Sequence, residues 1–273
     1  MKVEVYGALH SPWVQAVLLA LHEKGIDHSV RWLPPLEVFR KWGVLMPAVL
    51  LDDGPWEIES ADILAKLGFD RIADADLLAV QGAWQGVVHR PDNPLRFFYR
   101  FSLDGDRSAS YLKRSVRNFF RSFIAFYMCT LINFVKLSRK PKDPDDFGLQ
   151  YLVWETALEV SDGPFIAGDR PGAKDLMLFG VIQCHSSIPV PPLEPLRSDD
   201  RLGRLRDWIA AMHERFDEYP YLYSGSYFTP NLPEPVPADY LQRVIFLLGV
   251  VVMFAAFPIT LPLVFLLMRK VPR

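Results

Sequence analysis

Two stretches near the amino terminus decide the fold: YGALHSPWVQAVLLALHEKGI at residues 6–26 and MPAVLLDDGPWEIESADILAKLG at residues 46–68. In the first, a short apolar run, a turn and then apolar residues at helical spacing predict a strand followed by a helix. Ser11 and Pro12 are typical of a helix start, with serine as N-cap and proline at the first helical position. Gly25 ends the predicted helix, because glycine readily adopts the backbone that follows a last turn.

The second stretch predicts a β-hairpin and a further helix. Residues 47–51 and 56–59 have strand composition, and residues 52–55 between them are turn formers. Ser60 is expected to cap a helix over residues 60–67.

The segment between the two stretches completes a recognisable order. Residues 28–33 predict a second strand, parallel to the first through the intervening helix, and residues 37–42 a short helix. The resulting order, β-α-β-α-β-β-α, with the residues quoted above at its joints, resembles the thioredoxin-like domain of the glutathione S-transferase family. The resemblance covers most of residues 3–68.

The resemblance implies a glutathione site with a role for each of five residues. Ser11 matches the family's hydroxyl residue, which donates a hydrogen bond to the glutathione sulfur and favours the thiolate; an N-cap role alone is the alternative. Pro47 matches the cis-proline, and the backbone of Met46 would pair with the cysteinyl part of the peptide. Glu59 and Ser60 match the pair that holds the γ-glutamyl end.

Three features near this site depart from the family pattern. The segment between the second strand and residue 44 is short, and only Lys41 and Trp42 are available to contact the glycyl carboxylate. His10, beside Ser11, is expected to be solvated. No cysteine occupies position 11, which argues against a dithiol oxidoreductase.

The middle of the chain predicts an all-α second domain of the glutathione S-transferase type. Residues 163–183 resemble that domain's signature, a turn followed by a buried helix with an early aspartate, here Asp175. Gly172 stands where the family has a capping Ser or Thr, so half of the reciprocal capping box is missing.

The carboxyl end is the most apolar part of the sequence. Residues 244–268 carry no charge and would form a helix of roughly 37 Å, longer than the hydrocarbon core of roughly 30 Å. We expect a transmembrane anchor, separated from the folded head by a proline-rich spacer. A single span kinked at Pro258 and Pro262 is favoured over a re-entrant hairpin. Arg269, Lys270 and Arg273, after the span, favour the hairpin because of the positive-inside tendency.

Residues 107–142 contain nine basic residues and no acidic one. Because the basic groups flank an aromatic-rich apolar stretch, we expect contact with an anionic membrane surface and a substrate site that opens toward the bilayer. A core helix with solvated basic ends is the alternative. Nucleic-acid binding is not expected, because the anchor already accounts for the basic patch.

The composition is consistent with a head folded in the cytoplasm and attached to a membrane. The mean hydropathy of +0.10 is high for a soluble enzyme, and the first residues lack a signal-peptide pattern. Cys129 and Cys184 are far apart and isolated from metal-ligand spacings, so no metal is expected and both are interpreted as core thiols.

The predicted architecture is an α/β thioredoxin-like N-terminal domain, an all-α C-terminal domain and a C-terminal transmembrane helix. The expected boundaries are 1–69 for the first domain, 73–228 for the second, 229–242 for the linker and 243–273 for the anchor. The expected function is conjugation of glutathione, as co-substrate, to a small lipophilic electrophile, with a homodimer as a family expectation. The alternative is a non-catalytic membrane-bound adaptor that reuses the fold, because fold alone does not separate the two.

Overall fold

The computed structural model describes residues 2–106, 110–222 and 237–268. Its N-terminal part is a four-stranded sheet of order β2-β1-β3-β4, in which β1 runs parallel to β2 and antiparallel to β3. The strands are β1 (Val3–Tyr6), β2 (His28–Arg31), β3 (Ala48–Leu51) and β4 (Trp56–Glu57). The helices between and after them are α1 (Pro12–Glu23), α2 (Leu36–Trp42) and α3 (Ser60–Lys66). This is the predicted thioredoxin-like order.

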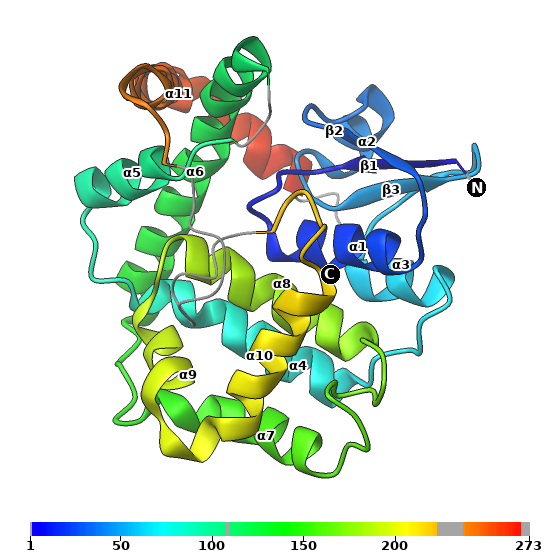
Figure 1. Ribbon diagram of the computed structural model, residues 1–273. Helices are drawn as coiled ribbons and strands as arrows, with labels where there is room; N and C mark the ends of the chain where they lie inside the picture. Colours follow the sequence, from blue (N-terminus) through cyan, green and yellow to red (C-terminus); the bar gives the residue numbers. More distant parts are fainter. Residues whose placement is uncertain (1, 107–109, 223–236, 269–273) are drawn as a thin grey trace.

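The pleat of β1 divides its side chains between two layers of helices. Val3 and Val5 join the large core that contains α1, whereas Tyr6 packs with Val38 and Trp42 of α2. Alternate strand residues point to opposite faces of a sheet. Helices α1 and α3 therefore cover one face and α2 the other (Figure 1).

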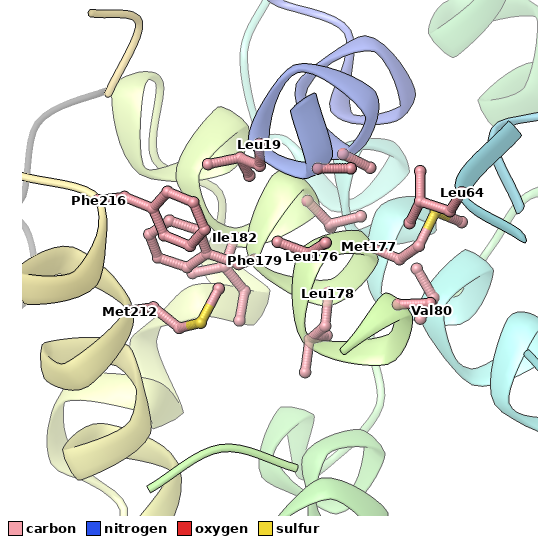
Figure 2. Packing of buried hydrophobic residues seen from close by; sticks show 14 of the residues in the cluster. Leu19, Leu64, Val80, Leu176, Met177, Leu178, Phe179, Ile182, Met212 and Phe216 are labelled. Carbon is pink, nitrogen blue, oxygen red and sulfur yellow. The ribbon is translucent and has the colours of Figure 1, made fainter. Parts of the chain in front are cut away.

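The rest of the head is helical and is built around one buried helix, α8. The elements are α4 (Asp74–Trp84), η1 (Gln85–His89), α5 (Pro94–Leu103), α6 (Tyr111–Arg139), η2 (Phe147–Tyr151), α7 (Leu152–Glu159), α8 (Ala173–Ser187), η3 (Pro191–Leu193), α9 (Glu194–Ser198), η4 (Asp200–Leu202) and α10 (Gly203–Arg215). Figure 2 shows Leu176, Phe179 and Ile182 of α8 among side chains from α1, α3, α4 and α10. The predicted all-α part is confirmed.

Asp175 links the start of α8 to the turn that precedes it through hydrogen bonds. Its fully buried carboxylate accepts hydrogen bonds from the backbone of Ile166, Ala167 and Gly172 at 2.7, 3.2 and 2.9 Å. The indole of Trp208 donates a fourth at 2.7 Å. Burial raises the pKa of this carboxyl, and the four donors oppose that shift. Its predicted structural role is confirmed.

The apolar carboxyl end forms one continuous helix, α11 (Tyr240–Met268), with both prolines inside it. No hairpin forms within the described part of this segment. The expectation that the segment stands apart from the head is wrong: α11 lies along α6 (Figure 1), with Phe246 fully buried and Gln242 nearly so. Within the described residues, α6 and α11 are both long and apolar enough to cross a membrane. The spacer over residues 229–236 and the basic residues at 269, 270 and 273 lie outside the described chain.

Three basic residues of α6 are directed into the head, whereas Lys113 and Arg139 at its two ends are exposed. Arg121 is buried and donates to the Phe101 carbonyl, and Arg117 pairs with Asp106 at 3.5 Å. Lys136 donates to the Arg90 carbonyl at 2.6 Å. These three cations therefore have partners inside the head: the loop before α6 supplies acidic groups to Arg117 and Arg121, and a backbone carbonyl serves Lys136. Arg107, another member of the cluster, is outside the described residues.

Replacing Asp175 with alanine is expected to lower the free energy of unfolding by about 3–5 kcal/mol, since several buried donors lose their acceptor. Denaturant unfolding of the detergent-solubilised protein measures the change. Asp169→Ala, at an exposed position in the preceding turn, serves as control and should shift the midpoint little. Equal effects of the two substitutions would contradict the role of Asp175 at the start of α8.

The stability of the head is expected to fall in mild acid because of His213. This ring is buried against Phe179, neither nitrogen has a hydrogen-bond partner among the described residues, and burial lowers its pKa to about 4. Below pH 6.5 the His213 side chain becomes protonated in the unfolded chain, whereas it stays neutral in the folded protein down to about pH 4. Stability is therefore lost as the pH falls from about 6.5 toward 4, by about 2 kcal/mol between pH 7 and 5.

Urea unfolding at these two pH values, with His213→Leu beside the parent, measures that loss. The substitution should remove about 2 kcal/mol of the pH dependence. An unchanged slope would assign the dependence to other groups, such as His185, whose pKa burial lowers to about 3.

Candidate functional site

The strand register brings three separate segments to one end of the sheet. Tyr6, the last residue of β1, pairs with Ala48, the first of β3, and Glu57 of β4 pairs with Val49. The chain that leaves β1, enters β3 and leaves β4 therefore meets at one edge. All five predicted site residues lie on these three segments.

Ser11 immediately precedes α1, as predicted. Its backbone donates to the Ala8 carbonyl at 2.9 Å, which closes the turn after β1. Its side chain makes no capping hydrogen bond to the helix, although serine usually caps in this way. The structure thus lends no support to a capping role, and the half-buried hydroxyl stands at the positive end of the helix dipole.

The second segment is the entry to β3, where the Met46–Pro47 peptide bond is cis. Pro47 is buried, and the Met46 sulfur accepts from the backbone of Ala8 at 3.3 Å. This contact joins the second segment to the turn that carries Ser11.

The third segment departs from the expected geometry. Helix α3 begins at Ser60, so Glu59 rather than Ser60 occupies the N-cap position. Glu59 has φ +74° and ψ +99°, a left-handed conformation that side chains other than glycine rarely adopt. Such strain costs of order 1–3 kcal/mol and is concentrated at functional sites. It presents the exposed Glu59 carboxylate beside the buried Ser60 at the helix start.

A cavity of about 270 Å³ opens beside the Ser11 turn, between the sheet and α6. It is lined by Gly7 to His10, by Trp32, by Ile124 of α6 and by Tyr221, with Arg117 and Arg121 among its polar groups. Ser11 adjoins this lining through its neighbour His10. The cavity therefore places a largely apolar space next to the predicted site.

A polar cluster that the sequence did not reveal holds the turn to the helical part. His10 Nε2 lies 2.9 Å from Asp104 and 3.0 Å from the Ser187 hydroxyl, and its ring packs on Phe101. Asp104 also lies 4.0 Å from Arg121. His10 is thus paired, and the expectation that it is solvated is wrong. The partners come from more than 90 residues away, so no local pattern signalled them.

Gln15, one turn into α1, was also missed. Its fully buried amide donates to the Leu9 carbonyl at 2.6 Å and accepts from Gln183 and Tyr219 at 2.7 and 2.8 Å. It therefore links the turn before Ser11 to α8 and to the end of the head. A glutamine in an otherwise apolar helix face was the only available signal.

Other candidates are less suited to chemistry. Lys41 is exposed and packs over the ring of Trp42, which is buried. Both cysteines are free and buried, and burial raises the pKa of Cys184. Among the described residues no group of His, Cys, Asp and Glu is arranged to hold a metal ion.

A comparison with protein families shows what the segment that forms this edge is similar to. Residues 10–68 match the family described as the glutathione S-transferase N-terminal domain. The predicted resemblance to the glutathione S-transferase family is therefore confirmed over residues 10–68. The match includes Ser11, the cis-proline segment and the Glu59–Ser60 pair. A comparison with curated protein sequences finds no match.

Solved glutathione S-transferases also align with the chain. Glutathione S-transferase III in its apo form is 17% identical, with 81% of this chain and 94% of that chain covered and a TM-score of 0.44. A theta-class glutathione S-transferase from Xanthomonas axonopodis pv. citri, with glutathione bound, is 16% identical, with coverages of 80% and 94% and a TM-score of 0.40.

Replacing Gln15 with leucine is expected to destabilise the protein by about 2–4 kcal/mol, because buried polar groups on three elements lose a partner. Unfolding in denaturant measures this loss. Gln81→Leu, the same change at an exposed position of α4, should change stability by less than about 0.5 kcal/mol. A Gln15→Leu protein as stable as the parent would contradict the linking role.

Proposed function

We propose that this protein binds glutathione at the sheet edge and conjugates it, through its sulfur, to an electrophile. The observation that carries the proposal is the strained backbone of Glu59, which directs its carboxylate outward beside the start of α3. In the proposal that carboxylate binds the γ-glutamyl ammonium, and Ser60 with the α3 backbone binds the carboxylate. Met46, preceding Pro47, offers its backbone to the cysteinyl residue as an added strand would.

Ser11 is assigned the thiol chemistry. A hydroxyl that donates to sulfur at a helix N-terminus lowers the pKa of a bound thiol and so raises its thiolate fraction. The thiolate would attack an electrophilic carbon, forming a carbon–sulfur bond while the leaving group departs with the electron pair. Tyr6 is not suited to this role, because its buried hydroxyl packs on the α2 side and burial raises its pKa.

The cavity beside the Ser11 turn is proposed as the electrophile site. Trp32, Leu9 and Ile124 give it apolar walls, which favours a small lipophilic substrate. We further propose that α11 attaches the protein to a membrane, with the head in the cytoplasm, because its apolar length exceeds the need of a buried helix. Lipophilic substrates would then be concentrated near the cavity. Homodimerisation is left as a family expectation.

A second candidate is a non-catalytic adaptor on the same membrane. The observation that favours it is the exposure of two leucines at the start of α2: Leu33 is 57% exposed and Leu36 is 63% exposed. Helix α2 has seven residues, and its Lys41 packs on Trp42, so α2 offers little to a glycyl carboxylate. An exposed apolar segment of this kind suits a protein partner.

Calorimetric titration of glutathione into the detergent-solubilised protein separates the two functions. We expect binding that Glu59→Ala weakens about tenfold or more, because a charge-assisted bond of about 1.4 kcal/mol or more is lost. Ser11→Ala should leave binding nearly unchanged and lower the rate of conjugation to a lipophilic electrophile.

Ser29→Ala, at an exposed position of β2, is the control and should alter neither quantity. No heat of binding up to about 10 mM glutathione, an affinity of about −3 kcal/mol, would remove the transferase and leave the adaptor.

A further inference from the structure

Helices α6 and α11 form a parallel pair. Gln242, near the start of α11, bonds to Asn118 and Ser115 in the first half of α6 at 2.6 and 2.8 Å. Further along both helices, the ring of Phe257 lies 5.2 Å from that of Phe126. Contacts that advance along both chains in the same direction show that the two helices run side by side with the same polarity.

The seam between the two helices is closely packed and contains polar groups as well as apolar ones. Besides the Gln242 bonds, Gly249 faces Ser122, and a Cβ at this glycine would overlap the serine oxygen and lie 2.6 Å from the Phe119 carbonyl. The residues of α11 that are buried recur at 242, 246, 249 and 253, a spacing of four and three. Small residues and hydrogen-bonding side chains at such a seam are the usual interface of helices packed inside a bilayer.

The outward face of α11 is apolar, whereas a face in contact with water is usually polar. Val244, Val251 and Phe254 lie opposite the seam and are 41%, 64% and 74% exposed. A docked helix of a soluble protein places its apolar face inward and its polar face in water. Here the buried side already contains Phe246 and Met253 beside Gln242, and the exposed side is apolar as well, so lipid rather than water is the solvent that this face fits.

Chain connectivity limits how the pair meets a bilayer. If parallel α6 and α11 both crossed it, residues 2–106 would lie on the side opposite to residues 140–222. These two parts share one core, in which Gln15 of α1 bonds to Gln183 of α8 at 2.7 Å. Helix α6 therefore does not span, although its composition would allow it. While α11 stays docked along α6, it too lies beside the head.

We propose that the protein binds a lipid bilayer as a monotopic protein, through a surface formed by the outward faces of the docked pair α6 and α11. The proposal rests on the membrane attachment proposed above and is independent of glutathione. Because Arg121 lies between the cavity and Phe246 of α11, at 5.0 Å from that ring, the same helix pair separates the cavity from lipid. The substrate site then lies at the membrane surface instead of at the end of a tether.

Depth-dependent fluorescence quenching tests this arrangement in the full chain. The fluorophore NBD is attached to a cysteine introduced by Val116→Cys on the exposed side of α6, by Phe254→Cys on α11, or by Val160→Cys at the far end of α7. The native cysteines are buried and do not compete for the label. The probe is a vesicle of phosphatidylcholine and phosphatidylglycerol that contains doxyl-labelled lipid.

We expect at least twofold stronger quenching at positions 116 and 254 than at 160. Quenching at 254 alone would overturn the proposal in favour of a tethered head on a detached anchor. Quenching at none of the three would likewise overturn the proposal, because the surface would then not enter the bilayer. Glutathione titration is unaffected by either outcome, so failure here is distinguishable from failure of the proposed transferase.

A pair of leucine substitutions tests the seam itself. Gly249→Leu cannot be accommodated against Ser122 and Phe119, and is expected to abolish quenching at 116 while preserving it at 254. Val251→Leu, two residues away on the outward face, should leave both unchanged. If Gly249→Leu keeps full quenching at 116, contact of α6 with lipid does not depend on the docked seam and the proposal fails.

Discussion

Helix α1 is enclosed on both sides, and the placement of the candidate site depends on this enclosure. The sheet covers one side, and α8 lies directly against the first turn on the other. At Gly180 of α8 a Cβ would lie 2.6 Å from the Pro12 carbonyl, so only glycine permits this approach. The two halves of the head thus meet one turn from Ser11. The hydroxyl is held by packing from both, and its position does not depend on a capping bond of its own.

The same enclosure divides the site between the two halves of the head. The sheet edge supplies Ser11, Met46 and Glu59, whereas α6 and the loop before it supply the far wall of the cavity and the partners of His10. Neither half forms the cavity alone. Polar groups at this junction are paired across it, which fixes the relative orientation of the halves more specifically than apolar contact would.

Helix α6 has two different environments along its sides. One side lines the cavity with Arg117, Arg121 and Ile124, and another receives α11. Arg117, Arg121 and Lys136 are directed to acidic and carbonyl partners within the head, whereas Val116, Leu131 and Phe134 of the same helix are exposed. A helix used in this way connects the chemistry of the cavity to the surface on which the protein rests, through a distance of a few side chains.

Local chemistry was sufficient to predict much of this protein from its sequence. The Ser11–Pro12 helix start, the glycine after α1 and the hairpin depend on interactions within a few residues, so their patterns appear in the sequence. The roles of Pro47 and Asp175 were instead implied by the family resemblance. The all-apolar carboxyl end was likewise evident. These features predicted the order of strands and helices, and the family resemblance that they carry predicted the thioredoxin-like sheet and the helical part that follows.

Contacts between distant residues decided the remainder. The pairing of His10 with Asp104, the inward direction of Arg117 and Arg121, and the seam between Gln242 and Asn118 each join segments that no periodicity connects. The strained backbone of Glu59 is likewise fixed by the elements on either side of it. A pattern of hydrophobicity specifies which face of a helix is apolar but not what covers it. Only the tertiary structure shows that one side of α11 is buried against the head, with Gln242 and Phe246 in it, while another apolar side remains outward.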